Sequence, residues 1–296
     1  MWMDVLLYGA LIPGAAAGLI ALLGARPVAL GQHVSHFGSM ALGGGFAAAF
    51  ALYFGIEGLS SPTSWQWVFW VSVVAMPLGT MTTGRIGRKL GFKGTFLLVA
   101  VVCALLLHPM MRKLVPHEIE SGAAWTWALG LGVLGAMLAS CMEVSARTFT
   151  AKKLLPAWLL YASLFAGLVF ELGSARLSQM SGFVAAGCGA FLVLAWLLPK
   201  RQILPTASFA FVLILLQIAA NTYFFGYDVA GLPLLLAGLP PVLLALSTRW
   251  KWLRNGKAIP TGIVLACTTV LPLLCAYAVA VMGGEVDAFD GSTLPY

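Results

Sequence analysis

Ten apolar stretches, each near twenty residues long, follow one another along this chain and are separated by short polar segments. A helix of about 20 apolar residues crosses the ~30 Å hydrocarbon core of a bilayer. The stretches cover residues 5–24, 37–56, 66–83, 94–110, 123–142, 154–172, 182–198, 205–225, 229–246 and 259–282. The pattern predicts an all-α fold, a polytopic helical membrane protein with about ten transmembrane helices in a single domain, residues 1–282. We expect the acidic tail that follows, residues 283–296, to be unstructured.

Composition supports lipid as the solvent of this chain. Hydrophobic residues fill 60% of the 296 positions and charged residues only 9%, whereas a water-soluble domain carries roughly 25% charged residues. The net charge of +7 fits basic loops between membrane spans, and we expect no nucleic-acid partner. The five cysteines all lie in apolar stretches without CxxC spacing, so we expect neither a disulfide framework nor a zinc site, and no cofactor.

The distribution of basic residues between loops predicts the orientation of the spans. If the N-terminus is outside, 14 of the 17 basic residues fall in segments on the inner side. Only Arg112, Lys113 and Arg176 fall outside. Cytoplasmic loops carry an excess of Lys and Arg, so we predict that both termini are outside. We place the protein in a cytoplasmic membrane, of the bacterial inner-membrane type, where the lipid bilayer is its first partner.

A polar face on the eighth stretch is the first candidate for chemistry. Gln217 and Asn221 are four residues apart and lie on one side of a helix, and Asp228 continues that side to the outer end. Amides at hydrocarbon depth must face protein or a water-filled cavity. They either join helices by hydrogen bonds or line a substrate path.

The ninth stretch contains the sequence Gly-Leu-Pro-Pro at its middle, which predicts an interrupted helix. Pro240 and Pro241 both lack an amide proton, so two successive helical hydrogen bonds are lost. Freed carbonyls at membrane depth need partners, and transporters use such interruptions to bind ions and substrates. A simple kink is the other interpretation, because proline is frequent in membrane helices.

Three further ionisable residues are candidates at the inner side. Glu143 is the one acid predicted there; it is either a proton or ion ligand or the helical salt-bridge partner of Arg147. His33 and His36, three residues apart, are weak candidates for a metal site. No carboxylate lies near them in sequence to support such a site, so a turn at the membrane interface is the alternative.

These features favour a secondary transporter or permease for a small molecule or ion. The chain carries no Walker-type glycine loop, HExxH or GxSxG motif, so we expect neither a nucleotide-driven pump nor a motif-bearing hydrolase. The alternatives are a structural or assembly subunit, as a homo-oligomer or in a larger membrane complex, and an intramembrane lipid-modifying enzyme. We assign no catalytic residue.

Overall fold

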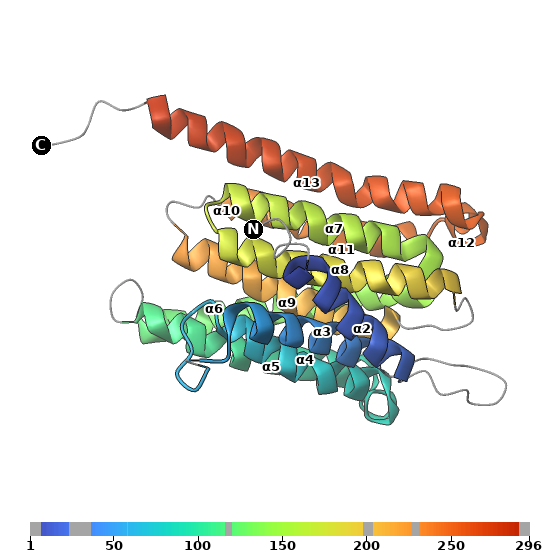
Figure 1. Ribbon diagram of the computed structural model, residues 1–296, viewed down its shortest axis with the longest axis horizontal. Coiled ribbons are helices and arrows are strands. Elements are labelled where there is room, and N and C mark those ends of the chain that lie inside the picture. The colour runs from blue at the N-terminus through green and yellow to red at the C-terminus, as the bar shows by residue number, and fades with distance from the viewer. Residues whose placement is uncertain are drawn as a thin grey trace, which may run out of the picture.

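The computed structural model describes residues 7–23, 37–57, 59–115, 120–197, 204–226 and 231–289, and every regular element in these ranges is a helix (Figure 1). The first half contains η1 (Leu7–Leu11), α2 (Ile12–Leu23), α3 (Gly38–Phe54), α4 (Trp67–Thr83), α5 (Arg85–Met111), η2 (Arg112–Leu114) and α6 (Ser121–Thr148). The second half contains α7 (Ala151–Glu171), α8 (Ala175–Leu197), α9 (Leu204–Phe225), α10 (Gly231–Ala237), α11 (Leu239–Ser247), α12 (Lys251–Asn255) and α13 (Ala258–Phe289). The predicted all-α fold is confirmed.

Six of the described helices are long and apolar enough to cross a membrane, namely Ile86–Leu114, Ser121–Thr148, Ala151–Glu171, Ala175–Leu197, Leu204–Phe225 and Ala258–Met282. Four shorter apolar helical segments, Leu7–Leu22, Gly38–Phe54, Trp67–Thr83 and Gly231–Ser247, coincide with the remaining predicted stretches. The structure is therefore that of a helical membrane protein with six candidate spans, and the count of ten stays a prediction.

Several helices extend beyond the apolar stretches that predicted them. Helix α5 begins at Arg85 and is broken at Gly91, so the part that matches the stretch predicted from residue 94 restarts at Phe92; α8 begins at Ala175, not at residue 182. Helix α13 continues to Phe289, into the segment expected to be unstructured. Hydropathy marks only the apolar part of a helix, whereas backbone hydrogen bonding continues into the polar turns at either end.

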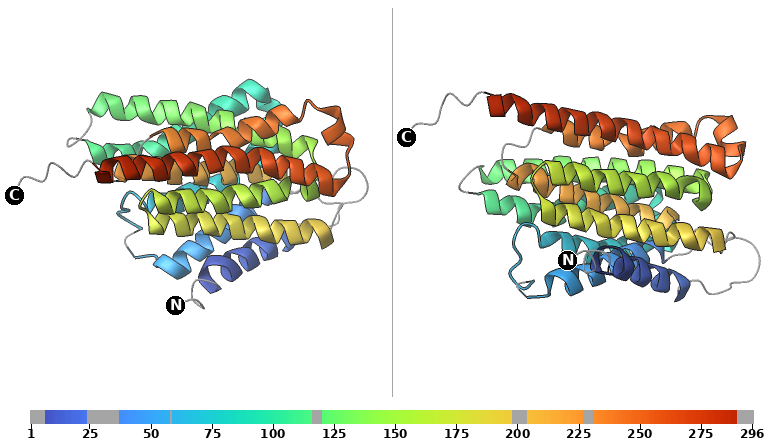
Figure 2. Two further views of the ribbon diagram at one scale, coloured as in Figure 1. Left: turned by 90° about the horizontal axis from the view of Figure 1, so that it is seen from above. Right: turned by 45° about the horizontal axis from the view of Figure 1, so that its top comes forward.

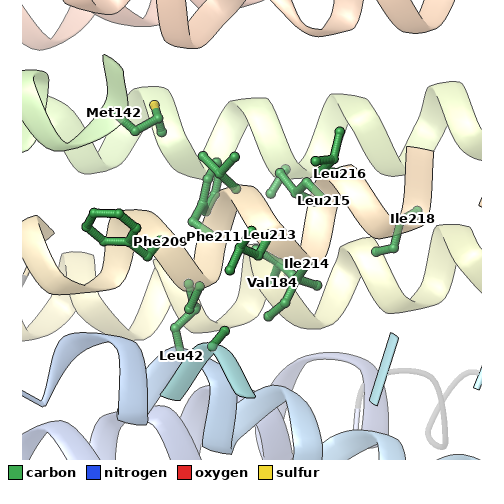
Figure 3. Close-up of a cluster of buried hydrophobic side chains, with 14 of the residues drawn as sticks. Leu42, Met142, Val184, Phe209, Phe211, Leu213, Ile214, Leu215, Leu216 and Ile218 are labelled. Atoms are coloured by element: carbon green, nitrogen blue, oxygen red, sulfur yellow. The ribbon is translucent and has the colours of Figure 1, made fainter. Parts of the chain in front are cut away.

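The helices lie roughly along one axis, and most long helices that follow one another run in opposite directions, whereas α10 and α11 continue in the same direction (Figures 1 and 2). Helix α9 is the centre of the bundle and packs against α3, α4 and α6. Helix α13 lies at one edge and packs mainly against α7. Figure 3 shows apolar side chains around α9, where Leu42 of α3, Met142 of α6 and Val184 of α8 approach Phe209, Phe211 and Ile214.

Small residues allow two close helix contacts in the bundle. A Cβ atom at Gly45 of α3 would lie 2.8 Å from the carbonyl oxygen of Pro13 in α2. A Cβ atom at Gly132 of α6 would lie 2.5 Å from the carbonyl oxygen of Ala100 in α5. Both distances are too short for a side chain, so glycine is required at these crossings, as small residues commonly are where membrane helices approach closely.

Candidate functional site

The ninth stretch is divided at Gly238, between α10 and α11, but the backbone of Gly238 stays near helical geometry (φ −79°, ψ −11°), so the division is a kink of a single residue. The amide of Gly238 still donates to the carbonyls of Leu234 and Leu235, at 3.1 and 3.0 Å, and closes the last turn of α10. Pro240 and Pro241 then occupy the first turn of α11, where a missing amide proton leaves no helical bond unmade. The Pro-Pro pair is thus accommodated by starting a new helix.

The carbonyl of Ala237, freed by this interruption, has a side-chain partner. The hydroxyl of Tyr161 in α7 donates a hydrogen bond of 2.9 Å to it. Both residues are buried, so an unpaired carbonyl there would have no water to replace the bond. Tyr161 therefore holds α7 against the interrupted segment.

A cavity of about 230 Å³ opens directly beside the interruption. Ala237, Gly238 and Pro241 form one wall of the cavity, and Tyr161 and Phe165 of α7 form another. The remaining lining comes from the following residues of α6, α9 and α10: Trp127, Leu131, Leu134, Leu138, Val212, Leu215, Leu216, Ala219, Ala220, Tyr223, Phe224, Gly231, Leu234 and Leu235. None of these described lining residues is charged, so the cavity suits the apolar part of a small ligand.

The two amides of the predicted polar face do not line this cavity. The Gln217 side-chain nitrogen Nε2 lies 3.1 Å from the sulfur of Met110 in α5. The Asn221 Nδ2 donates to the backbone carbonyl of Gln217 at 3.0 Å. Both side chains are buried, and the Asn221 Oδ1 has no hydrogen-bond partner in the described structure. Of the five predicted substrate-path residues, only Pro241 lines the cavity, and Asp228 lies outside the described residues.

Glu143 borders a second and larger cavity, of about 590 Å³, which shares no lining residue with the cavity beside Gly238. It lies where α4 ends, α5 begins and α6 ends. As predicted from their spacing, Glu143 and Arg147 form a salt bridge, with Nη2 2.6 Å from Oε1. The two share this cavity wall with Ser140 of α6.

The structure leaves the predicted histidine pair undecided, because His33 and His36 lie outside the described residues. Within the residues that are described, no three His, Cys, Asp or Glu side chains lie close enough together to hold a metal ion.

Two polar residues with long-range contacts were missed in the sequence. Tyr161 lies in an apolar stretch, and its hydroxyl was the available signal, because a buried tyrosine hydroxyl usually has a hydrogen-bond partner. Lys153 was counted only as a loop charge. Its side chain is buried, and Nζ donates to the carbonyls of Leu253 and Arg254 at 3.4 and 2.7 Å.

Comparison with known proteins gives this chain no relatives: it matches no family model, no curated protein and no solved structure.

Proposed function

We propose that this protein is a permease for a small amphipathic solute whose apolar part binds in the cavity beside Gly238. The observation that carries the proposal is the interrupted helix pair α10–α11, which opens into that cavity between α6, α7 and α9. Interrupted helices with ligand sites beside them are a recurring feature of secondary transporters.

The size and lining of the cavity define the solute class. About 230 Å³ is less than the 300–1,000 Å³ typical of sites for drug-sized ligands. The lining offers polar side-chain atoms only at Trp127, Tyr161 and Tyr223. A wholly apolar solute would cross lipid without a carrier, so a substrate needs a polar or charged group outside this cavity and an apolar body within it.

We also propose that the chain crosses a bacterial-type cytoplasmic membrane ten times with both termini outside. Charges of the described residues support this orientation. The end of the bundle formed by the α4–α5, α6–α7 and α11–α13 connections carries Arg88, Lys89, Lys93, Arg147, Lys152, Lys153, Arg249, Lys251, Arg254 and Lys257. At the other end, the described basic residues are Arg112, Lys113 and Arg176. Such an asymmetry is typical of an inner side and an outer side.

Cysteine labelling tests the orientation. In a variant without the five native cysteines, a single cysteine is introduced by Glu57→Cys or by Lys89→Cys, and intact cells are treated with a membrane-impermeant maleimide. We expect labelling of Glu57→Cys in intact cells and of Lys89→Cys only after the membrane is permeabilised. The reverse order would overturn the orientation.

Flux measurements test the transport proposal. The purified full-length protein is reconstituted in liposomes with radiolabelled phenylalanine, tyramine or indole-3-acetate, which share an aromatic body and differ in charge. We expect protein-dependent flux of at least one probe, and its loss when Ala219→Phe fills the cavity. Ala278→Phe, at an exposed position of α13, is the matched control and should retain flux.

Absence of flux for all three probes would overturn the proposal as stated. Purification in mild detergent would then decide about the alternative function, an assembly subunit of a membrane complex. A stoichiometric partner protein would support that alternative.

A further inference from the structure

The larger cavity, near Glu143, differs in chemistry from the one beside Gly238. Its walls come from the end of α4, the start of α5 and the end of α6. Its lining includes four hydroxyl side chains, Thr82, Thr83, Thr95 and Ser140. The backbone of α5 leaves helical geometry at Gly91, where φ is 66°, and Gly91 and Phe92 lie on the cavity wall. A glycine tolerates this left-handed conformation without strain.

The charges on the cavity wall sum to a net positive charge. Arg88 and Arg147 contribute two guanidinium groups and Glu143 one carboxylate. Arg147 donates from Nε and Nη2 to the same Glu143 oxygen, at 2.9 and 2.6 Å, so its charge is largely compensated. Arg88 forms no ion pair with a described residue. The cavity therefore favours an anion, and Arg88 is its uncompensated cation.

The hydrogen-bond donors available to such an anion are mainly guanidinium groups. The hydroxyls of Thr82, Thr83 and Ser140 donate to carbonyls of their own helices, at 2.9, 2.7 and 2.7 Å. These three hydroxyl protons are therefore not available to an anion in the cavity. A guanidinium has five N–H donors in a planar fork that matches phosphate oxygens. The helix that restarts at Phe92 adds the positive end of its dipole to the same wall.

We propose that this cavity binds a phosphate group, with Arg88 as its main ligand and Glu143 as the charge that limits affinity. An anionic phospholipid headgroup and soluble phosphate share this chemistry. The lipid source is favoured by the apolar rim, where Phe92 is 71% exposed and Val144 45% exposed. Basic pockets between membrane helices on the inner side bind anionic headgroups. This inference is independent of the permease proposal, because it concerns a different cavity: α6 contributes to both cavities, but the two share no lining residue.

Binding is measured on the full-length protein in detergent by titration followed with native mass spectrometry. The probes are phosphatidylglycerol, phosphatidylcholine of the same acyl chains, and inorganic phosphate against chloride at equal ionic strength. We expect phosphatidylglycerol to bind more tightly than phosphatidylcholine. Arg88→Gln should weaken phosphatidylglycerol binding about fivefold, the scale of one basic residue near an anionic surface. Glu143→Gln should strengthen it.

Arg249→Gln is the matched control, because it removes an exposed arginine from the same end of the bundle but outside the cavity. It should leave phosphatidylglycerol affinity within about twofold of the unaltered protein. Tighter binding of inorganic phosphate than of the lipid, lost in Arg88→Gln, would also support a phosphate site and identify a soluble source. An equal loss in Arg88→Gln and Arg249→Gln, or no change in Arg88→Gln, would overturn the proposal. So would weaker binding in a folded Glu143→Gln variant.

Discussion

The hydroxyl of Tyr161 lies 2.9 Å from the carbonyl oxygen of Ala237 and donates a hydrogen bond to it. Ala237 is the last residue of α10, and the helix does not continue through Gly238. A carbonyl released by an interruption at hydrocarbon depth must be bonded within the protein. One side chain from α7 thus stabilises the interrupted helix and forms part of the wall of the cavity beside it.

Removing this hydroxyl should destabilise the protein. We expect Tyr161→Phe to lower the free energy of unfolding by about 1–3 kcal/mol, the cost of leaving a buried acceptor unbonded. Unfolding by dodecyl sulfate in mixed micelles measures it. Tyr277→Phe is the control: it removes a hydroxyl that bonds Glu171, the last residue of α7, at 2.8 Å between exposed residues, so no buried acceptor is left unbonded. Equal effects of the two substitutions would contradict a special role for Tyr161.

Two glycines of α6 should respond in opposite ways to alanine. Gly132→Ala places a methyl group 2.5 Å from the carbonyl oxygen of Ala100, so we expect a loss of about 1–3 kcal/mol from overpacking. A Cβ atom at Gly130 would instead point into open space, with no atom of a neighbouring helix within 4 Å. There Gly130→Ala should stabilise by about 0.5–1 kcal/mol through helix propensity. Unfolding by dodecyl sulfate measures the stability of both variants. If Gly130→Ala were also destabilising, α6 would be sensitive to any added methyl group, and the close contact at Gly132 would not explain the loss.

The buried Lys153 should be more important for stability than an exposed lysine at the same end of the bundle. Its Nζ donates to two carbonyls near the end of α12 and so joins α7 to the α12–α13 segment. We expect Lys153→Met to lower the unfolding free energy by about 1.5–3 kcal/mol, the range for hydrogen bonds to charged groups. Lys257→Met removes the same charge from an exposed site and should change stability by less than about 0.5 kcal/mol. A similar loss in both variants would mean that the positive charge itself stabilises this end of the bundle, and not the hydrogen bonds from Lys153 to α12.

Asn221 separates the two interpretations of the polar face on α9. Its Oδ1 is buried without a partner, so we expect Asn221→Leu to leave the unfolding free energy unchanged or raise it by up to about 1 kcal/mol. Flux of a transported probe should persist, because Asn221 does not line the cavity beside Gly238. Asn221→Ala, which leaves a void, should lower stability. Loss of flux in a stable Asn221→Leu variant would restore Asn221 to the substrate path.

Local features of the chain were readable from sequence because they depend on near neighbours. The apolar stretches predicted the helices of the bundle, since a helix satisfies its own backbone hydrogen bonds in lipid. The Pro240–Pro241 pair predicted the interruption near Gly238, and the spacing of Glu143 and Arg147 predicted their ion pair. Each of these rests on residues within a few positions of one another.

The partners of the candidate residues were decided by tertiary packing. Gln217 approaches Met110 and Tyr161 approaches Ala237, contacts between residues far apart in the chain. The membrane-span part of α13, Ala258–Met282, is more hydropathic than that of α9, yet α9 is the buried centre and α13 the exposed edge. In a membrane protein apolar side chains face lipid as readily as protein, so hydropathy determines which segments are helices but not which of their faces meet. The sequence alone therefore determined the helices and the charges at their ends, whereas the tertiary structure alone decided which side chains surround each cavity.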